Sequence, residues 1–403
     1  MTLDEARALD AADPLRAMRE RFALPEGVIY LDGNSLGAPS KASAKRVART
    51  IEEEWGRDLI ASWNKHGWIE QSARLAAMIA PIVGAGRDEI SVGDSTSINL
   101  AKLLGAGLKA RPGRKVVLSE TGNFPTDLYI AAAVPGAELR TVAAADIPAA
   151  LTDEVAVLML THVDYRSATV HDMVALTRAA HDVGALALWD LSHSAGAIPL
   201  ELAASGADLA VGCGYKYLNG GPGAPAYLFV ARALQNALSN PLPGWLGHAD
   251  PFAFEPDYRP APGIARFTSG TPSIIAMAAL EAGLATFDGV AMADLAAKSR
   301  ALSELFRAEI DARCPELALA SPTDPMQRGS HLVFAYPYAY ALMQALIARG
   351  VIGDYREPDL VRFGFTPLYN GFEDMVRAAS IIAEVLATRE WDRPQFNARS
   401  KVT

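Results

Sequence analysis

One lysine of this chain lies between two tyrosines, directly after an apolar run and directly before a glycine-rich turn. The segment is Gly212-Cys-Gly-Tyr-Lys216-Tyr-Leu-Asn-Gly-Gly-Pro-Gly223. The run at 208–212 predicts a buried strand, so the amine of Lys216 is expected where that strand opens into a loop. There it would have aromatic neighbours and a backbone that a ligand can approach closely. A solvated loop lysine is the alternative interpretation.

A second apolar run, Leu186-Ala-Leu-Trp-Asp190, ends in a carboxylate, and His193 follows three residues later. Since the carboxyl ends of parallel strands meet at one edge of a sheet, Asp190 and Lys216 are expected to lie close together. A lysine that holds an aldehyde as a Schiff base and an acid that keeps a pyridine nitrogen protonated are the groups that pyridoxal phosphate (PLP) requires. The alternatives are a helix cap for Asp190 and a structural role for His193.

Two further segments offer the phosphate cradle and the stacking ring that such a site needs. Gly93-Asp-Ser-Thr96-Ser97 precedes a predicted helix, whose free N–H groups and dipole suit a phosphate. Phe124 and Asp127 follow a predicted strand, where the ring of Phe124 can lie on the cofactor and Asp127 can add a polar contact. Each segment would serve equally well as an ordinary cap or turn.

Arg362 lies inside an apolar run, Leu360-Val-Arg-Phe-Gly, near the end of the chain. Arginine is seldom placed in such a run without a partner. Its guanidinium fork pairs naturally with a carboxylate, which favours an amino-acid substrate. A structural ion pair is the alternative.

The composition excludes several other classes of protein. Of 403 residues, 50% are hydrophobic and 21% are charged, which is typical of a well-buried globular chain. The net charge of −9 argues against nucleic acid or an anionic membrane as partner. No apolar run approaches the roughly 20 residues that span a bilayer. The two cysteines, Cys213 and Cys314, form no disulfide framework, so a cytoplasmic location is expected. No dinucleotide-binding or Walker A pattern occurs.

Apolar runs alternate with helical periodicity from about residue 70 to 235, which predicts a mainly parallel sheet in a large domain. A long loop region at 235–272, one helical stretch at 273–309 and a smaller α/β domain follow, with a polar, loose tail after Trp391. The predicted strands are 115–119, 137–142, 155–160, 185–189, 209–213, 226–230, 331–335 and 360–365, and the later helices are 171–183, 338–349 and 371–388.

Taken together, these segments resemble the kynureninase family, in the aspartate-aminotransferase-like superfamily (fold type I) of PLP enzymes. The resemblance runs from about Tyr30 to Asp374. It rests on Tyr30-Leu-Asp-Gly-Asn-Ser-Leu-Gly, Asn123-Phe-Pro-Thr-Asp, Trp189-Asp-Leu-Ser-His-Ser-Ala-Gly, Tyr215-Lys-Tyr-Leu-Asn-Gly-Gly-Pro-Gly, Gly244-Trp-Leu-Gly-His and Thr366-Pro-Leu-Tyr-Asn-Gly-Phe-Glu-Asp. It implies an N-terminal segment (1–60) that packs with the small domain, a large PLP-binding domain (61–272) and a small C-terminal domain (273–403).

The resemblance also implies roles for single residues. Lys216 would carry the cofactor, Phe124 would stack on its ring and Asp190 would pair with the ring nitrogen. The phosphate would be lined by Thr96, Ser97, Tyr215, Trp245 and Thr271, the last two reaching over from the other subunit of a homodimer. Asp127, Ser167 and His193 would complete the cofactor shell.

At the substrate, Asn34 and Arg362 would hold the α-carboxylate, and Tyr215 would be an acid or base at the β-carbon. Trp63, Gly270 and Thr271 would lie near the aryl end, and the Gly270-Thr271 pair resembles the bacterial type, which favours L-kynurenine over its 3-hydroxy form. Gly214 departs from the family pattern, because relatives commonly carry a small hydroxyl residue there.

The implied reaction is the PLP-dependent hydrolysis of the Cβ–Cγ bond of L-kynurenine to anthranilate and L-alanine, with no metal, in tryptophan catabolism or NAD biosynthesis. Catalysis would depend on Lys216, Tyr215 and Asp190. Three alternatives stay open: a cysteine-desulfurase-like PLP lyase, which needs a mobile cysteine, a decarboxylating or transaminating relative, and a PLP-binding protein without catalysis.

Overall fold

The computed structural model describes residues 1–399, and its larger half is built on a seven-stranded sheet. The strand order is β2-β8-β7-β6-β5-β3-β4, and all neighbouring pairs are parallel except those of β8, which runs antiparallel to β2 and β7. The strands are β2 (Ile90–Val92), β3 (Val116–Glu120), β4 (Glu138–Val142), β5 (Val155–Thr161), β6 (Leu186–Asp190), β7 (Leu209–Gly212) and β8 (Tyr227–Val230). The predicted mainly parallel sheet is therefore confirmed.

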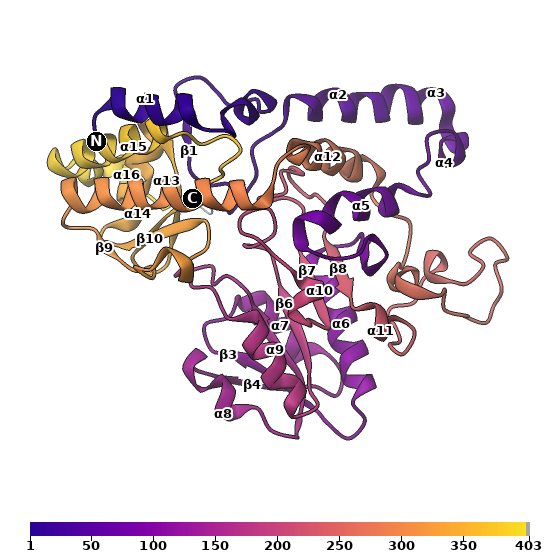
Figure 1. The fold of residues 1–403 in the computed structure, drawn as a ribbon. Helices are drawn as coiled ribbons and strands as arrows, with labels where there is room; N and C mark the ends of the chain where they lie inside the picture. Colours follow the sequence, from indigo (N-terminus) through magenta and orange to yellow (C-terminus); the bar gives the residue numbers. More distant parts are fainter. Residues whose placement is uncertain (400–403) are drawn as a thin grey trace.

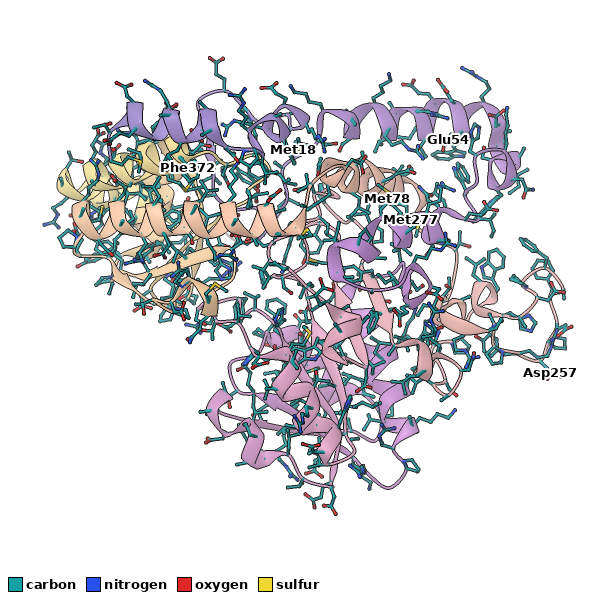
Figure 2. The ribbon with its side chains drawn as sticks, in the orientation of Figure 1. Met18, Glu54, Met78, Asp257, Met277 and Phe372 are labelled. Carbon is teal, nitrogen blue, oxygen red and sulfur yellow. The ribbon has the colours of Figure 1, made fainter. Side chains whose placement is uncertain are left out.

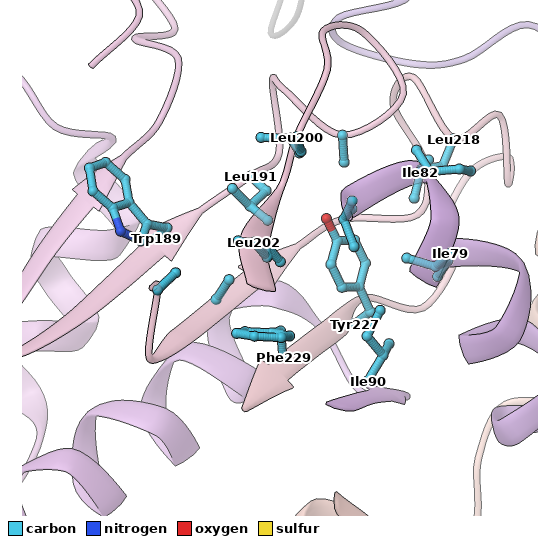
Figure 3. Packing of buried hydrophobic residues seen from close by; sticks show 14 of the residues in the cluster. Ile79, Ile82, Ile90, Trp189, Leu191, Leu200, Leu202, Leu218, Tyr227 and Phe229 are labelled. Atoms are coloured by element: carbon cyan, nitrogen blue, oxygen red, sulfur yellow. The ribbon is translucent and has the colours of Figure 1, made fainter. Parts of the chain in front are cut away.

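The central strands are apolar along their whole length because helices cover both faces of the sheet. Every residue of β5, β6 and β7 is buried. On one face, Trp189 and Leu191 belong to the same buried cluster as Tyr227, Phe229 and residues of α5 (Gln71–Val83), part of which Figure 3 shows. Polar groups can be placed only where these strands end, and that edge holds Asp190 and the loop of Lys216.

The helices around this sheet begin at recognisable caps. The side chain of Ser95 accepts a hydrogen bond at the start of α6 (Thr96–Ala110), and that of Asp172 does so at the start of α9 (Met173–Asp182). Pro125 occupies the first position of α7 (Pro125–Ala133), where its missing N–H costs nothing.

A second, four-stranded sheet forms the core of the small domain, in the order β12-β13-β10-β9. The strands are β9 (Ala318–Leu319), β10 (His331–Ala335), β12 (Asp354–Arg356) and β13 (Leu360–Gly364), and all three pairings are antiparallel. Phe306, Phe334, Phe363 and Phe365 pack edge to face or tilted in its core. The covering helices are α13 (Met292–Arg313), α14 (Ala339–Ala348) and α15 (Phe372–Ala387).

The N-terminal segment is tied to this small domain. β1 (Ile29–Tyr30) pairs with β11 (Val351–Ile352), and α1 (Leu3–Ala12) lies along α15 in Figure 1. The carboxylate of Asp10 accepts hydrogen bonds from the backbone N–H groups of Phe372 and Glu373, and so caps α15 from outside. The predicted three-part division of the chain stays a prediction, and its last four residues lie outside the described part.

The chain then passes to the large domain through α2 (Lys41–Arg49), which packs on α12 (Ile274–Leu284). The loop around Asp257 projects from the body of the molecule (Figure 2). The other helical elements are η1 (Arg16–Arg21), η2 (Thr50–Trp55, a π-helix), α3 (Gly56–Asp58), η3 (Leu59–Ala61), α4 (Ser62–Lys65), α5 (Gln71–Val83), η4 (Arg87–Glu89), η5 (Ala144–Asp146), α8 (Ile147–Ala150), α10 (Leu202–Ser205), α11 (Arg232–Gln235), η6 (Trp245–Gly247), η7 (Gly263–Phe267), η8 (Ala285–Phe287), η9 (Pro325–Gln327), η10 (Glu390–Asp392) and α16 (Pro394–Asn397).

Two sequence-based expectations were wrong. The single helical stretch at 273–309 is broken between η8 and α13, where Gly289 takes a positive φ of 75° and the chain bends by 83°. The tail after Trp391 is not loose up to residue 399, because Trp391 and Phe396 are buried against the small domain.

Within residues 1–399, no single helix has the length and apolar character needed to cross a membrane. One sharply bent pair, Ile274–Phe287 with Met292–Arg313, reaches that threshold by length and composition alone.

We predict that the buried ion pair between Asp13 and Lys298 is needed for stability. The two groups lie 2.6 Å apart with side chains 3% and 7% exposed, so Asp13→Asn leaves a buried ammonium without its counterion. The free energy of unfolding should fall by about 3–5 kcal/mol. Urea denaturation checks this, with Asp4→Asn, in an exposed pair with Arg7, as the matched control that should lose less than about 1 kcal/mol. An equal effect of both variants would contradict the prediction.

Candidate active site

Lys216 lies in the loop after β7, at the carboxyl edge of the large sheet, and is half-buried. Its Nζ lies 3.3 Å from Nε2 of His193, and 5.9 Å and 5.8 Å from the ring centres of Phe124 and Tyr215. The loop packs closely on Gly37, where an added Cβ would lie 2.3 Å from the carbonyl oxygen of Lys216. The structure therefore brings these predicted residues together from three separate segments, the loops after β3, β6 and β7.

Asp190 and Asp127 form a pair of buried carboxyl groups beside this lysine. Oδ1 of Asp190 accepts hydrogen bonds from the backbone N–H and the hydroxyl of Ser192, at 2.8 Å and 2.6 Å. Burial, and next the adjacent charge of Asp190, raise the pKa of Asp127 well above its ordinary value. A cationic N–H group placed against this pair would relieve the repulsion, which is the partner that a protonated pyridine ring offers.

Phe124 presents a partly exposed ring at the end of β3. Its backbone N–H donates to Oδ1 of Asn123 at 2.7 Å, and its ring meets that of Tyr165 edge on, with centres 5.2 Å apart. Asn123 is fixed in turn by the hydroxyls of Ser119 and Thr161. These three supporting polar residues were not predicted, although polar residues at the ends of two apolar strands are a signal that could have found them.

Two more buried histidines accompany His193. The ring of His331, at the start of β10, has its centre 5.8 Å from that of His193, and neither of its nitrogens has a hydrogen-bond partner among residues 1–399. Burial lowers the pKa of both His193 and His331 well below the usual range, and the charges of Lys216 and Arg362 act in the same direction. His162 follows β5, and burial lowers its pKa to about 4. Sequence reasoning missed His331, which reads as part of an apolar strand.

Thr96 and Ser97 begin α6, as the phosphate cradle requires. The preceding Asp94 takes a positive φ of 54°, and its carboxylate accepts from Nζ of the buried Lys102 at 2.5 Å. Lys102 also donates to the carbonyl oxygen of Phe267 at 2.9 Å. This lysine, which was not predicted, therefore holds the turn that presents the start of the helix.

Ser167 lies in the loop between β5 and α9. Its hydroxyl donates to Oδ1 of Asp164 at 2.6 Å and lies 2.8 Å from the hydroxyl of Thr169. The next residue, Ala168, takes a positive φ of 67°. The local hydrogen bonds thus fix Ser167 in a tight turn next to Tyr165.

Arg362 is buried in β13 and makes the structural ion pair that the sequence left open. Its Nε donates to Oδ1 of Asp354 at 2.8 Å, and its Nη2 donates to Oδ2. With its amide oxygen turned toward Arg362, Asn34 accepts from Nε at 2.8 Å and from Nη2 at 3.1 Å. Gly364 makes room for Asn34, since a Cβ there would lie 1.8 Å from an atom of its terminal amide group. The two predicted carboxylate-binding residues are therefore in contact.

The remaining predicted residues gather at a different place. Trp63, Gly270 and Thr271 line one pocket of about 510 Å³, and the ring of Trp63 meets that of Trp245 with centres 6.5 Å apart. Within residues 1–399, no hydrogen bond or ring contact joins these four to Lys216. One chain therefore contains two separate sets of candidate site residues.

Three small residues, Gly214 and Cys213 beside Lys216 and Cys314 in the core of the small domain, bear on the alternatives. At Gly214, a Cβ would lie 2.4 Å from the carbonyl oxygen of Pro225, so this backbone has no room for the small hydroxyl residue that the family resemblance implies there. Cys213 and Cys314 are both buried free thiols, and burial raises the pKa of each. Neither is an exposed thiolate of the kind that attacks a substrate. Among the described residues, no group of three or more His, Cys, Asp or Glu could hold a metal ion.

Comparison with known proteins gives the relationships of the chain. A family model described as the kynureninase C-terminal domain matches residues 295–382. Curated kynureninases of Burkholderia mallei (strain SAVP1) and Pseudomonas fluorescens are 50% and 49% identical over the whole of both chains. Among solved structures, an apo cysteine desulfurase from Thermococcus onnurineus NA1 has a TM-score of 0.77 at 19% identity, covering 92% of this chain and 98% of its own. A C-DES mutant with glycine covalently linked to its PLP cofactor has a TM-score of 0.78 at 17% identity, covering 91% and 99%.

We predict that His162 makes the protein less stable in mild acid. The unfolded chain takes up a proton on this residue below about pH 6.5, whereas the folded chain does so only near pH 4, so the free energy of unfolding falls as the pH drops through this window. The loss assigned to His162 is about 3 kcal/mol. Urea denaturation from pH 7 to pH 4 should show a correspondingly smaller loss for His162→Gln. If both proteins lose the same amount, His162 is protonated normally in the folded state.

Proposed function

The chain belongs to the kynureninase family, and we propose that it hydrolyses the Cβ–Cγ bond of L-kynurenine to anthranilate and L-alanine with PLP as its cofactor. The observation that carries this proposal is the grouping of Lys216 with the buried carboxyl pair of Asp127 and Asp190. That pair fits a cationic ring nitrogen, and the lysine amine beside it fits an aldehyde.

The residues that would hold the cofactor are those of this edge of the sheet. Lys216 would bind it covalently, the ring of Phe124 would lie against it, and Asp190 would pair with its ring nitrogen. The start of α6, with Thr96 and Ser97, would bind its phosphate. When bound, PLP supplies an electron sink for the negative charge that develops on the substrate carbon atoms.

Lys216 would then act as the acid and base at the α-carbon of the substrate. Its neighbour His193 supports this role, because burial keeps the imidazole neutral and leaves Nε2 free to accept a hydrogen bond from the lysine amine 3.3 Å away. A neutral neighbour does not repel a protonated lysine, so the amine can take up and return a proton.

Tyr215 is our candidate acid at the β-carbon. Burial raises the pKa of its phenol above the ordinary value, and Cys213 and Asp190 act in the same direction, so the hydroxyl keeps its proton at neutral pH. Water would add to the γ-ketone before the bond breaks, which makes the balanced reaction L-kynurenine plus water to anthranilate plus L-alanine. Arg362 and Asn34 would hold the α-carboxylate throughout.

We also propose a cytoplasmic homodimer in which each subunit completes the site of the other. The second set of residues, Trp63, Trp245, Gly270 and Thr271, would then reach the phosphate and the aryl end of the substrate in the partner. Apolar side chains that a monomer would leave in water support this, among them Ile60 and Phe254, which are 80% and 76% exposed. The Gly270-Thr271 pair would favour L-kynurenine over the 3-hydroxy form.

One prediction of this proposal concerns the reaction and the role of Lys216. The purified protein, loaded with PLP and incubated with L-kynurenine, should release anthranilate, followed by its fluorescence, and L-alanine in equal amounts. Lys216→Ala should lower kcat/KM by at least about 1000-fold, since both the covalent link and the proton transfer are lost. The exposed Lys109→Ala is the matched control and should keep its activity. Near-normal turnover by Lys216→Ala, or sulfide from cysteine in place of anthranilate, contradicts the proposal.

Another prediction concerns the active site that two subunits of the homodimer would form together. Lys216→Ala and Trp245→Ala should each be nearly inactive, but a mixture of the two after subunit exchange should recover up to about a quarter of the wild-type activity. The reason is that half of the dimers would be hybrids with one intact site. No recovery, although hybrid dimers are detected by mass spectrometry, would mean that Trp245 acts on the site of its own chain.

A further inference from the structure

The guanidinium group of Arg362 is held on one edge by a charged acceptor. Asp354 accepts hydrogen bonds from both Nε and Nη2 of this arginine, and Asp354 and Arg362 are 2% and 1% exposed. Such a two-point contact fixes the plane of the fork as well as its charge.

The sheet register makes this contact a built-in feature of the small domain. Asp354 on β12 and Arg362 on β13 are direct antiparallel partners, so their side chains leave the same face of the sheet. His331 and Gly364 are the partners of the next row on that face, where Asn34 fills the space above the glycine. The ion pair therefore lies on the same face of the sheet as His331. The ring of His331 contacts that of His193, whose Nε2 lies next to Nζ of Lys216.

Among residues 1–399, the other edge of Arg362 donates to two neutral acceptors. Nη1 donates to the carbonyl oxygen of Tyr165 at 2.7 Å, and Nη2 donates to the hydroxyl of Ser35 at 3.0 Å. Tyr165 belongs to the large domain, and Ser35 belongs to the N-terminal segment. A carboxylate can replace such neutral acceptors on an arginine, whereas it would have to displace a charge to take the edge that Asp354 occupies.

Asp354 stays ionised in these surroundings. Burial opposes its charge, but Arg362 and then Arg356 outweigh burial, so the pKa of Asp354 lies below its ordinary value. Nη2 of Arg356 and the hydroxyl of Ser35 both donate to Oδ2 of Asp354, each at 2.7 Å. Every contact that holds Asp354 therefore favours the carboxylate form.

We infer that Asp354 is a positioning residue, which turns the Nη1–Nη2 edge of Arg362 toward the α-carboxylate of the substrate. The inference rests on the proposed function, because it assumes an amino-acid substrate bound through Arg362. It also explains why a charged acceptor lies next to an anion-binding group. Asp354 repels the substrate carboxylate, but this repulsion is offset because the guanidinium group of Arg362 is already oriented before the substrate binds.

Orientation and charge predict opposite results when the carboxylate is neutralised. If Asp354 mattered only through its negative charge, Asp354→Asn would remove the counterion of Arg362. The uncompensated positive charge would then bind anions more strongly. If Asp354 orients the fork, the same variant weakens the binding of a carboxylate. We expect the weakening.

The test compares two small ligands of the PLP-loaded protein, L-alanine and L-alaninamide, which differ only in the α-carboxylate. Their dissociation constants are measured from the change in cofactor absorbance. Asp354→Asn should lower the preference for L-alanine over L-alaninamide by at least about tenfold. A general loss of structure would weaken both ligands alike and would leave this ratio unmoved. An unchanged or increased ratio overturns the inference.

Two further variants keep the test decisive. Glu357→Gln removes a negative charge from the same segment at an exposed position and should leave the ratio unchanged. Asp354→Glu keeps the charge but moves the carboxylate by one methylene group, so it should also lower the ratio, and it replaces Asp354→Asn if that variant does not fold. A ratio unchanged in Asp354→Glu then overturns the inference.

Failure of this inference can be told apart from failure of the proposed function. Binding of L-alanine involves no cleavage of a carbon–carbon bond, so the ratio can be measured whatever reaction the enzyme performs. Wild-type protein that releases anthranilate while Asp354→Asn keeps its ratio refutes only the role of Asp354. Wild-type protein that releases none, while the variant loses its ratio, refutes only the substrate.

Discussion

The repulsion between two buried carboxyl groups, Asp127 and Asp190, is the constraint on which the rest of the site depends. Both side chains are almost excluded from water, and burial together with the adjacent Asp190 raises the pKa of Asp127 well above its ordinary value. A fold keeps such a pair where one group holds a proton or where positive charge is supplied nearby, and Lys216 is such a charge. The parallel sheet provides the place, because strands buried on both faces can present polar groups only at their ends. Lys216 and the loop after β7 are brought to the same edge by that topology.

Much of this arrangement could be predicted from the sequence because the signals are local. The continuous apolar runs of β5, β6 and β7 indicate a sheet that is buried on both faces. Asp190 ends one of these runs, and Lys216 lies in the loop after another. The break before α13 was missed because the apolar periodicity resumes beyond it, although the Asp288-Gly289 dipeptide at the bend favours a turn. β2 was missed because three residues are too few to show a period.

Other parts of the site depend on register, which no local pattern contains. Arg362 signalled a buried partner, but the choice of Asp354 follows from the pairing of β12 with β13. His331 looked like an ordinary member of an apolar strand, and its position next to His193 arises only when the small domain meets the large one. The roles of Trp63 and Trp245 came from the resemblance alone, since nothing in their spacing indicates that they belong to a second set of residues.

The choice of chemistry on this fold is made by side chains and not by the fold itself, because cysteine desulfurases share it at low sequence identity. A desulfurase needs a thiolate that can reach the substrate, whereas both cysteines here are buried and burial favours their thiol form. Tyr215 instead presents a phenol that burial keeps protonated beside Lys216. A protonated phenol cannot act as the nucleophile that a desulfurase needs. It can, however, donate its proton to a carbanion that develops on the substrate. The residues around the lysine are thus suited to breaking a carbon–carbon bond.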